Sequence, residues 1–341
     1  MKFDFIIGNP PYQDENEKNT RKPPIYHLFM NGAYEVADKV ELITPARFLF
    51  NAGQTPKEWN RRMLSDVHLK VLDYEPDAEK VFPNTDIKGG VAITYHDSFK
   101  YFGEIGIFTA WSELNSILTK VKIHLDKGSL KDITVGAVPY RFSERLKKDM
   151  PGIENDIGKS FDLRTNVLDN LEGKVFSADK PDDGRDYVQI LGLKDKKRTF
   201  RWIRKDWVEV PDNFYKWKVF VPKANGTGSF GESLSSPIIG RKLLGHTQTF
   251  ISIGGFETEN EAKNLLKYIM TKFARALLGV LKTTQDNPRS TWGYIPLQDF
   301  TSSSDIDWSQ SIADIDQQLY RKYGLDEKEI EFIETHVKEM K

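Results

Sequence analysis

The sequence predicts a mixed architecture, in which an α/β part is followed by a β-rich α+β part and a helical C-terminal tail. The first observation is an apolar run at residues 3–8, which ends abruptly at Gly8 and predicts a buried strand. The second is an alternation of strand-like and helix-like periods that continues to residue 96. The third is a change near residue 126, after which the apolar runs are shorter and turn residues and aromatics are more frequent.

The α/β part is expected to span residues 1–110 and to open with the strand at 3–8. A polar segment at 13–22 predicts a loop. The elements after it are predicted as a helix at 25–38, a strand at 40–44, a helix at 59–64, and strands at 67–74 and 89–96. The first helix is predicted from an apolar face formed by Leu28, Phe29, Ala33, Val36 and Ala37. This order is typical of the second half of a doubly wound, Rossmann-like sheet.

The remaining chain divides into three predicted segments. A connecting segment at 111–125 contains a helix at 113–122. The β-rich part spans 126–300 and holds a helix pair at 261–268 and 271–281. The tail at 301–341 is predicted to form one long helix at 312–338.

The composition describes a folded protein and excludes several kinds of chemistry. The chain has 341 residues, of which 39% are hydrophobic, and a net charge of −1, which neither favours nor excludes a nucleic-acid partner. It has no cysteine, which excludes disulfides, thiolate metal sites and a cysteine nucleophile. The six histidines lack ligand spacing, so no metal is expected. No apolar run is as long as a membrane span and no signal peptide is evident, so we expect a cytoplasmic location and no membrane partner.

The residues that carry most functional information are Asn9, Pro10, Pro11 and Tyr12, which directly follow the first strand. Two consecutive prolines make a rigid turn and leave the Pro10 carbonyl without a ladder partner. The Asn9 side-chain oxygen and this carbonyl form two neighbouring acceptors that suit the exocyclic NH2 of a base, and Tyr12 offers a flat face for stacking. The simpler interpretation is an ordinary turn between a strand and a loop.

The N-P-P-Y motif resembles that of the DNA amino-methyltransferases that use S-adenosylmethionine. The Asn form, preceded by F-D-F-I-I-G, looks most like the N6-adenine enzymes of restriction–modification systems. The resemblance implies methyl transfer to N6 of a flipped adenine in specific duplex DNA, with Asn9, Pro10 and Tyr12 as catalytic residues. It also implies that Phe82, in a V-F-P setting, packs on the adenine opposite Tyr12. The alternative for Phe82 is a core side chain that caps the sheet.

The sequence departs from this family at the methyl-donor site. The family's F-x-G-x-G turn should precede N-P-P-Y, where only eight residues are present. We therefore expect the C-terminal portion of a longer enzyme, or one polypeptide of a split enzyme, inactive without its N-terminal half or companion subunit. Residues that bind the cofactor cannot be assigned in this chain. Gly226, Gly228 and Gly231 fit G-x-G-x-x-G, but no helix is predicted after them, which favours a glycine-rich surface loop.

A basic and aromatic stretch at 194–223 predicts a contact with DNA. It holds ten Lys or Arg against four acids, interleaved with aromatics, which suits a track for the phosphate backbone. The alternative is a solvated sheet whose aromatics form the core. A polar loop at 282–292 adds further candidates, and the whole region resembles a target-recognition domain. The candidate DNA-binding residues are Arg201, Arg204, Lys205, Lys218, Lys223, Lys282, Gln285 and Arg289.

Other functions remain open at this stage. The chain could be a DNA-recognition module without activity, an RNA amino-methyltransferase, or a methyltransferase acting on protein glutamine. A nuclease is a further alternative, because Glu172-Gly173-Lys174 fits E-x-K, although a clear upstream Pro-Asp pair is missing.

Overall fold

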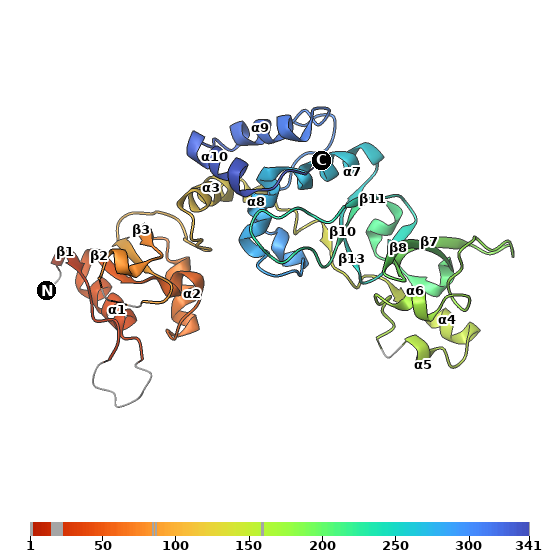
Figure 1. Cartoon of the computed structure of the whole chain (residues 1–341), viewed down its shortest axis with the longest axis horizontal. Helices are drawn as coiled ribbons and strands as arrows, with labels where there is room; N and C mark the ends of the chain where they lie inside the picture. The colour runs from red at the N-terminus through yellow and green to blue at the C-terminus, as the bar shows by residue number, and fades with distance from the viewer. Residues whose placement is uncertain (1–2, 15–22, 84, 86, 158–159, 341) are drawn as a thin grey trace. The chain divides into compact units, whose positions relative to one another are not determined.

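The structure is a computed structural model that describes residues 3–14, 23–83, 85, 87–157 and 160–340 (Figure 1). Contacts divide the chain into two compact units, Met1–Asn115 and Ser116–Lys341. The mixed α/β class is confirmed, because the chain forms several small sheets together with helices. Most of the predicted loop at 13–22 lies outside the described residues, although Gln13 forms an isolated bridge with Pro24. None of the helices in the described part of the chain is long and apolar enough to cross a membrane.

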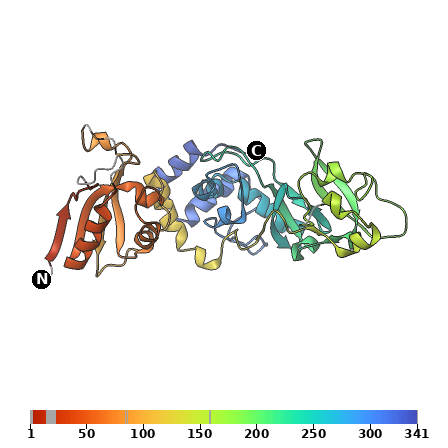
Figure 2. The ribbon, with the colours of Figure 1, turned by 90° about the horizontal axis from the view of Figure 1, so that it is seen from below.

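The first unit contains one four-stranded sheet and two helices, which Figure 2 shows from a second side. Its elements are β1 (Phe3–Gly8), α1 (Tyr26–Val36), β2 (Ala37–Pro45), η1 (Ala46–Phe50), α2 (Lys57–Ser65), β3 (Leu69–Glu75), η2 (Ala78–Lys80) and β4 (Val91–Asp97). The sheet order is β1-β2-β4-β3, with β1 parallel to β2 and β4 antiparallel to both of its neighbours. The predicted succession of strands and helices is therefore confirmed, with small shifts of their ends.

The core of the first unit lies between the helices and one face of the sheet. It includes Met30 of α1, Leu42 of β2 and Trp59 of α2, which are all buried. The predicted apolar face of α1 was wrong in part: Leu28 is 57% exposed and Phe29 is 46% exposed, whereas Ala33 packs against the core and Ala37 is buried. Tyr26 and Met30, which lie four residues apart and so on the same side of the helix, are its buried residues. The sequence thus contained two apolar sides for this helix, and the side with Tyr26 and Met30 faces the core.

Strand β1 is an edge strand, which corrects the prediction that it is buried. Phe3, Phe5 and Ile7 project from one face and are 53%, 43% and 74% exposed, respectively. Phe5 stacks on Tyr95 of β4, with ring centroids 6.4 Å apart, whereas Ile6 packs against the core on the opposite face. The strand is thus as apolar as an interior strand. The described residues nevertheless leave one of its faces and one of its edges uncovered.

The second unit is built from short strands and twelve helical segments of varied length within the described residues. Helix α3 (Ser112–Lys122) matches the predicted connecting helix and carries the chain into this unit. The strands are β5 (Thr134–Val135), β6 (Arg141–Phe142), β7 (Tyr187–Lys194), β8 (Lys197–Arg204), β9 (Val208–Glu209), β10 (Trp217–Pro222), β11 (Ile238–Gly240), β12 (Leu244–His246) and β13 (Phe250–Phe256). They form sheets in the orders β11-β10-β13-β5, β12-β7-β8 and β6-β9.

The helical segments of this unit are distributed along its whole length. After α3 they are η3 (Leu125–Lys127), α4 (Glu144–Asp149), α5 (Glu154–Ile157), α6 (Val167–Asn170), η4 (Lys205–Trp207), η5 (Asp212–Tyr215), α7 (Glu259–Met270), α8 (Lys272–Leu281), η6 (Arg289–Trp292), α9 (Ile312–Lys322) and α10 (Glu327–His336). Helices α7 and α8 match the predicted helix pair. Their apolar faces are buried, with Leu265 and Leu277 fully inaccessible.

The tail forms two helices, which corrects the prediction of one long helix. Helix α9 ends before Gly324, which has a φ of +62° that favours glycine. Asp326 then caps α10 and forms a reciprocal capping box with Glu329. The sequence G-L-D-E-K-E therefore held both a helix stop signal and a helix start signal.

Candidate active site

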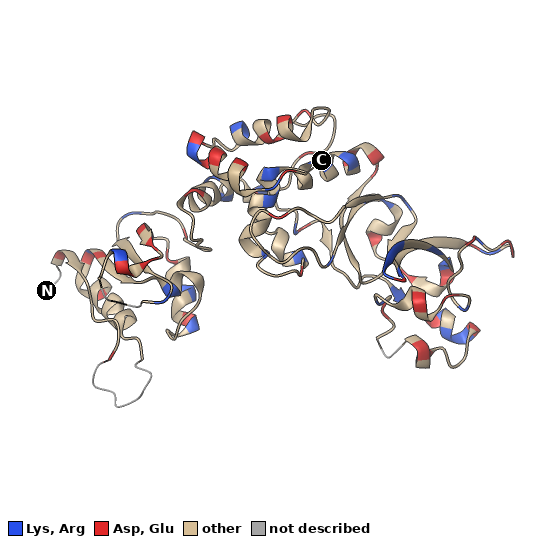
Figure 3. Cartoon of the chain, in the orientation of Figure 1, with Lys and Arg blue, Asp and Glu red and all other residues tan. Residues whose placement is uncertain are grey.

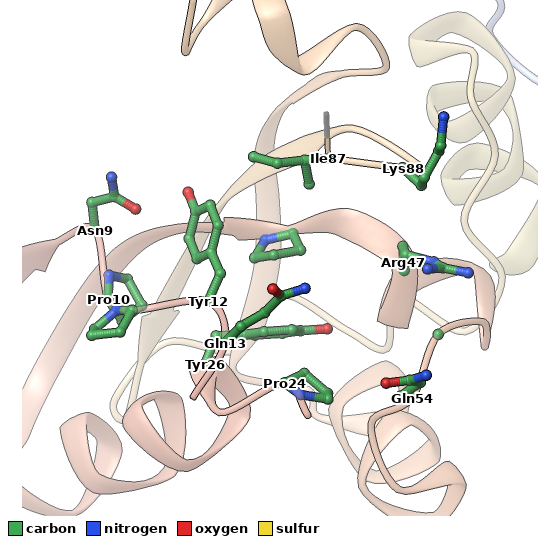
Figure 4. Close-up of a pocket in the computed structure, with 13 residues that line it drawn as sticks. Asn9, Pro10, Tyr12, Gln13, Pro24, Tyr26, Arg47, Gln54, Ile87 and Lys88 are labelled. Atoms are coloured by element: carbon green, nitrogen blue, oxygen red, sulfur yellow. The ribbon is translucent and has the colours of Figure 1, made fainter. Parts of the chain in front are cut away.

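The N-P-P-Y motif lines a cavity of about 660 Å³ in the first unit (Figure 4). This volume lies within the ~300–1,000 Å³ that is usual for small-molecule and cofactor sites. The motif begins directly after the C-terminal end of β1, and the neighbouring parallel strand β2 contributes Pro45 to the same cavity. The lining residues are Asn9, Pro10, Pro11, Tyr12, Gln13, Pro24, Tyr26, Pro45, Arg47, Gly53, Gln54, Ile87 and Lys88.

Backbone hydrogen bonds hold the motif in place on its C-terminal side. The Ile25 N–H donates to the Tyr12 carbonyl at 3.1 Å, and the Asp14 N–H donates to the Pro23 carbonyl at the same distance. No described residue donates a hydrogen bond to the Pro10 carbonyl or to the Asn9 side chain. Asn9 is exposed and Pro10 half-buried. The two predicted acceptors therefore lie at the cavity with their oxygens available to a ligand.

Tyr12 is half-buried, and its hydroxyl is buried without a hydrogen-bond partner among the described residues. Burial raises the pKa of this phenol to about 12, so the side chain is neutral at physiological pH. In Figure 4 its ring stands beside the Asn9 amide at one end of the cavity. This arrangement provides an aromatic surface next to two acceptors.

Phe82 contacts Tyr12, but not in the geometry that the resemblance implies. The two ring centroids are 6.3 Å apart and the ring planes meet at 73°, which is an edge-to-face contact. A base between two stacking rings needs them roughly parallel, and Phe82 is not among the residues that line the cavity. In this structure the two rings therefore pack on each other, and stacking of Phe82 on a base stays a prediction.

The opposite end of the cavity carries Arg47 and Lys88, together with the amide of Gln54 (Figure 4). Our sequence reasoning did not select these residues. A signal was present, because Arg47 closely follows a predicted strand. This strand, β2, runs parallel to β1, and the carboxyl ends of parallel strands lie at one edge of a sheet.

All eight predicted DNA-binding residues lie in the second unit, where acidic residues accompany the basic ones (Figure 3). The Arg201 Nε donates to both carboxylate oxygens of Glu172, at 2.9 and 2.8 Å. Arg204 is buried and pairs with Asp149 at 2.8 Å and Asp206 at 2.6 Å. These guanidinium groups are therefore engaged within the protein.

Lys218 and Lys282 differ most from the predicted basic track, because both are buried. The Lys218 ammonium donates to the carbonyls of Phe214, Lys216 and Arg241 at 3.1–3.2 Å, and its burial lowers its pKa to about 7. The Lys282 ammonium donates to Glu232 at 2.6 Å. The pattern of basic residues interleaved with aromatics here reflects a core in which the lysine heads satisfy internal acceptors.

The other candidates are accessible. Lys205 lies near the ring of Tyr215, Lys223 is half-buried, and Gln285 is exposed. Arg289 is also exposed, and its Nε donates to the Lys131 carbonyl at 2.7 Å. Their contacts with DNA stay predictions.

The glycine-rich loop around Gly228 holds an internal carboxylate. Glu232 accepts hydrogen bonds from the backbone N–H groups of Thr227 and Gly228, at 2.9 and 3.0 Å. Ser233 and the residues after it form no helix, as expected. The N–H groups that a phosphate would need are thus already bound.

The residues of the alternative nuclease motif are paired within the chain. Glu172 contacts Arg201 and Lys194, and Lys174 contacts Asp156. Among the described residues there is no group of three or more His, Asp or Glu side chains that could hold a metal ion.

The first part of the chain is similar to a known family of proteins. Residues 1–82 match the model of the Eco57I restriction-modification methylase family, which confirms the resemblance predicted from N-P-P-Y. An "Uncharacterized adenine-specific methylase" of Mycoplasma pneumoniae is 32% identical over 96 residues, which cover 27% of this chain and 22% of that protein. The match thus spans about a fifth of the length of this relative.

Two solved structures overlap larger parts of the chain at low similarity. The type IIG restriction endonuclease BpuSI is 10% identical over 87% of this chain and 44% of its own, with a TM-score of 0.29. The type IIL restriction-modification enzyme MmeI, solved in complex with DNA, is 8% identical over 98% of this chain and 56% of its own, with a TM-score of 0.27. At TM-scores this low the two likenesses support no assignment.

Proposed function

We propose that this protein takes part in the transfer of a methyl group from S-adenosylmethionine to N6 of a flipped adenine in specific duplex DNA. The family to which residues 1–82 are similar consists of restriction-modification methylases, and the curated relative is described as adenine-specific. The observation that carries the proposal is that Asn9, Pro10 and Tyr12 lie together on a cavity large enough for a purine.

The proposed chemistry follows from the groups at the Asn9 end of the cavity. Adenine N6 is a poor nucleophile, because its lone pair is conjugated with the ring. If the Asn9 oxygen and the Pro10 carbonyl accept hydrogen bonds from the two N6 hydrogens, they orient the amine and favour a tetrahedral nitrogen whose lone pair is free to react. Tyr12 replaces part of the stacking that the base loses when it leaves the duplex.

The methyl donor is proposed to bind outside this cavity. When bound, S-adenosylmethionine supplies an electrophilic methyl group. Its ribose hydroxyls and its amino group call for acidic partners, and the part of the cavity lining that the structure describes offers no carboxylate. The cavity thus suits the acceptor base and not the donor.

The sheet supports a proposal for the position of the donor-binding part. Strands β1, β2, β4 and β3 have the mixed order and directions of one half of a doubly wound sheet. The apolar side chains of β1 and its unpaired edge suit a further parallel strand and covering helices. We propose that an N-terminal half or a companion subunit supplies them.

Duplex DNA is the proposed partner of a target-recognition domain at 126–300, which a connecting segment at 111–125 precedes and a helical tail at 301–341 follows. The accessible candidates for contact are Lys205, Lys223, Gln285 and Arg289. Lys218 and Lys282 are not retained for this role, because their ammonium groups are buried against internal acceptors.

The substitution Asn9→Ala tests the proposed function. In the enzyme together with its donor-binding part, we expect loss of methyl transfer of at least about a hundredfold, because one of two acceptors for N6 is removed. DNA affinity should change little. The measurement is transfer of a labelled methyl group to DNA, alongside a filter-binding assay.

Asn166→Ala is a matched control, because Asn166 is an exposed asparagine of the second unit. Full methyl transfer by Asn9→Ala would refute the proposal. DNA binding without any methyl transfer by the wild-type assembly would instead support the alternative of a non-catalytic DNA-recognition module.

A further inference from the structure

We propose that Arg47 binds a phosphate group of the DNA backbone next to the target adenine, so that the cavity holds a whole nucleotide and not only its base. This inference rests on the proposed function and extends it to the charged part of the substrate. It assigns a role to a residue at the end of the cavity opposite Asn9 and Tyr12 (Figure 4).

The first supporting observation is the position of Arg47 on a fixed backbone. It lies in η1 (Ala46–Phe50), directly after Pro45 at the end of β2. The Ala46 N–H donates to the Gly90 carbonyl at 3.0 Å, which ties this turn to the segment that carries Lys88. The Ala52 N–H donates to the Arg47 carbonyl at 3.0 Å, which closes the turn on its other side.

The second observation is that two glycines make room for the aliphatic stem of Arg47. A Cβ atom at Gly89 would lie 2.8 Å from the Arg47 Cγ, and one at Gly53 would lie 3.3 Å from its Cβ. Both glycines have positive φ, +86° and +92°, respectively. The chain therefore passes close to the stem on two sides, and fewer conformations remain for the side chain to lose when it binds a ligand.

The third observation is the lack of an internal partner for the guanidinium. The Arg47 guanidinium forms no hydrogen bond or ion pair with the described residues, in contrast to those of Arg201 and Arg204, which pair with acids. The described residues that line the cavity include no acid, and Lys88 adds a second cationic side chain at the same end. Burial raises the pKa of the Tyr26 phenol to about 12, and the positive charge of Arg47 opposes part of this rise.

These features together describe a cavity with two chemically distinct ends. One end offers hydrogen-bond acceptors and an aromatic face, which suit a base with an amino group. The other offers the Arg47 guanidinium, which has no acidic partner among the described residues and suits an anion. A nucleotide has both parts in one molecule, with the phosphate separated from the base by the sugar.

The test compares deoxyadenosine with its 5′- and 3′-monophosphates, and therefore needs no knowledge of the DNA recognition sequence. Binding to the full chain is measured by calorimetry or ligand-observed NMR at low salt. We expect at least one monophosphate to bind about tenfold more tightly than deoxyadenosine, as for a charge-assisted contact worth about 1.4 kcal/mol. Arg47→Met should remove this advantage and leave the affinity for deoxyadenosine unchanged, and Arg47→Lys should restore part of it.

Arg61→Met is the matched control, because Arg61 is an exposed arginine of α2 that does not line the cavity. Equal affinities for deoxyadenosine and both monophosphates, or an equal loss for all three in Arg47→Met, would overturn the inference. The inference would also be overturned if Arg47→Met weakened the binding of S-adenosylhomocysteine and left that of the monophosphates unchanged. Arg47 would then bind the carboxylate of the donor.

The variant Asn9→Ala separates this inference from the proposed function. It should weaken deoxyadenosine and the monophosphates by the same factor, and so preserve their ratio. If deoxyadenosine binds and Asn9→Ala does not weaken it, the base site fails, and the inference fails with it. If Asn9→Ala behaves as expected but the phosphate advantage is absent, only the role of Arg47 fails.

Discussion

Replacing Lys218 by methionine should change how the stability of the second unit depends on pH. The Lys218 side chain is fully buried, and burial lowers its pKa from the usual 10.5 to about 7. Between these two pH values the unfolded chain binds a proton that the folded chain has released. Stability then rises with pH, at up to 1.36 kcal/mol per pH unit.

The expected magnitude follows from the width of this window. Between pH 7.5 and 9.5 the free energy of unfolding of the wild type should rise by roughly 2 to 3 kcal/mol relative to Lys218→Met, because the variant lacks the titrating group. Urea denaturation across this range, followed by tryptophan fluorescence, measures the difference. All other groups titrate in both proteins and cancel.

Lys197→Met is the control, because Lys197 is an exposed lysine of β8 and its profile should run parallel to that of the wild type. Parallel profiles for Lys218→Met and the wild type would refute the reasoning. DNA affinity gives an independent readout: Lys218→Met should leave it unchanged, whereas a large loss together with a reduced salt dependence would restore Lys218 as a phosphate contact.

Two further predictions concern stability. Glu232→Ala should lower the free energy of unfolding by about 3 to 5 kcal/mol, because it leaves the buried Lys282 ammonium without its carboxylate partner. In urea denaturation, the double variant with Lys282→Met should recover much of this loss. Purely additive effects of the two substitutions would contradict the pairing. Thr258→Ala should cost about 1 kcal/mol, because Thr258 caps α7 and forms a capping box with Glu261; an unchanged denaturation midpoint would argue against a role of this cap in stability.

The α/β part could be predicted largely from the sequence, because its elements are short and each is set by local signals. Pro45 ends β2, and the N-P-P-Y turn follows Gly8 of β1. The burial of β1 could not be predicted, since an apolar strand has the same sequence at the centre and at the edge of a sheet. Only its pairing partners decide which of the two it is.

The candidate site was predicted in part. Asn9, Pro10 and Tyr12 came from one contiguous motif, whereas Arg47 and Lys88 come from segments that only the folded sheet brings to the same cavity. The basic stretch failed as a predictor for Lys218, because composition counts charges but does not report their acceptors. The acceptors of the Lys218 ammonium are three backbone carbonyls, and their positions cannot be predicted from the sequence.

The acid inside the glycine-rich loop has a practical consequence for how nucleotide binding by this protein is interpreted. The Glu232 carboxylate acts there as a built-in mimic of a phosphate, tethered four residues from Gly228 and neutralised by Lys282. An external phosphate would have to displace the Glu232 carboxylate, which has a high effective concentration at these N–H groups because it belongs to the same chain. An adenine nucleotide that binds to the intact protein should therefore bind outside this loop. The G-x-G-x-x-G pattern alone would wrongly assign such a site to the second unit.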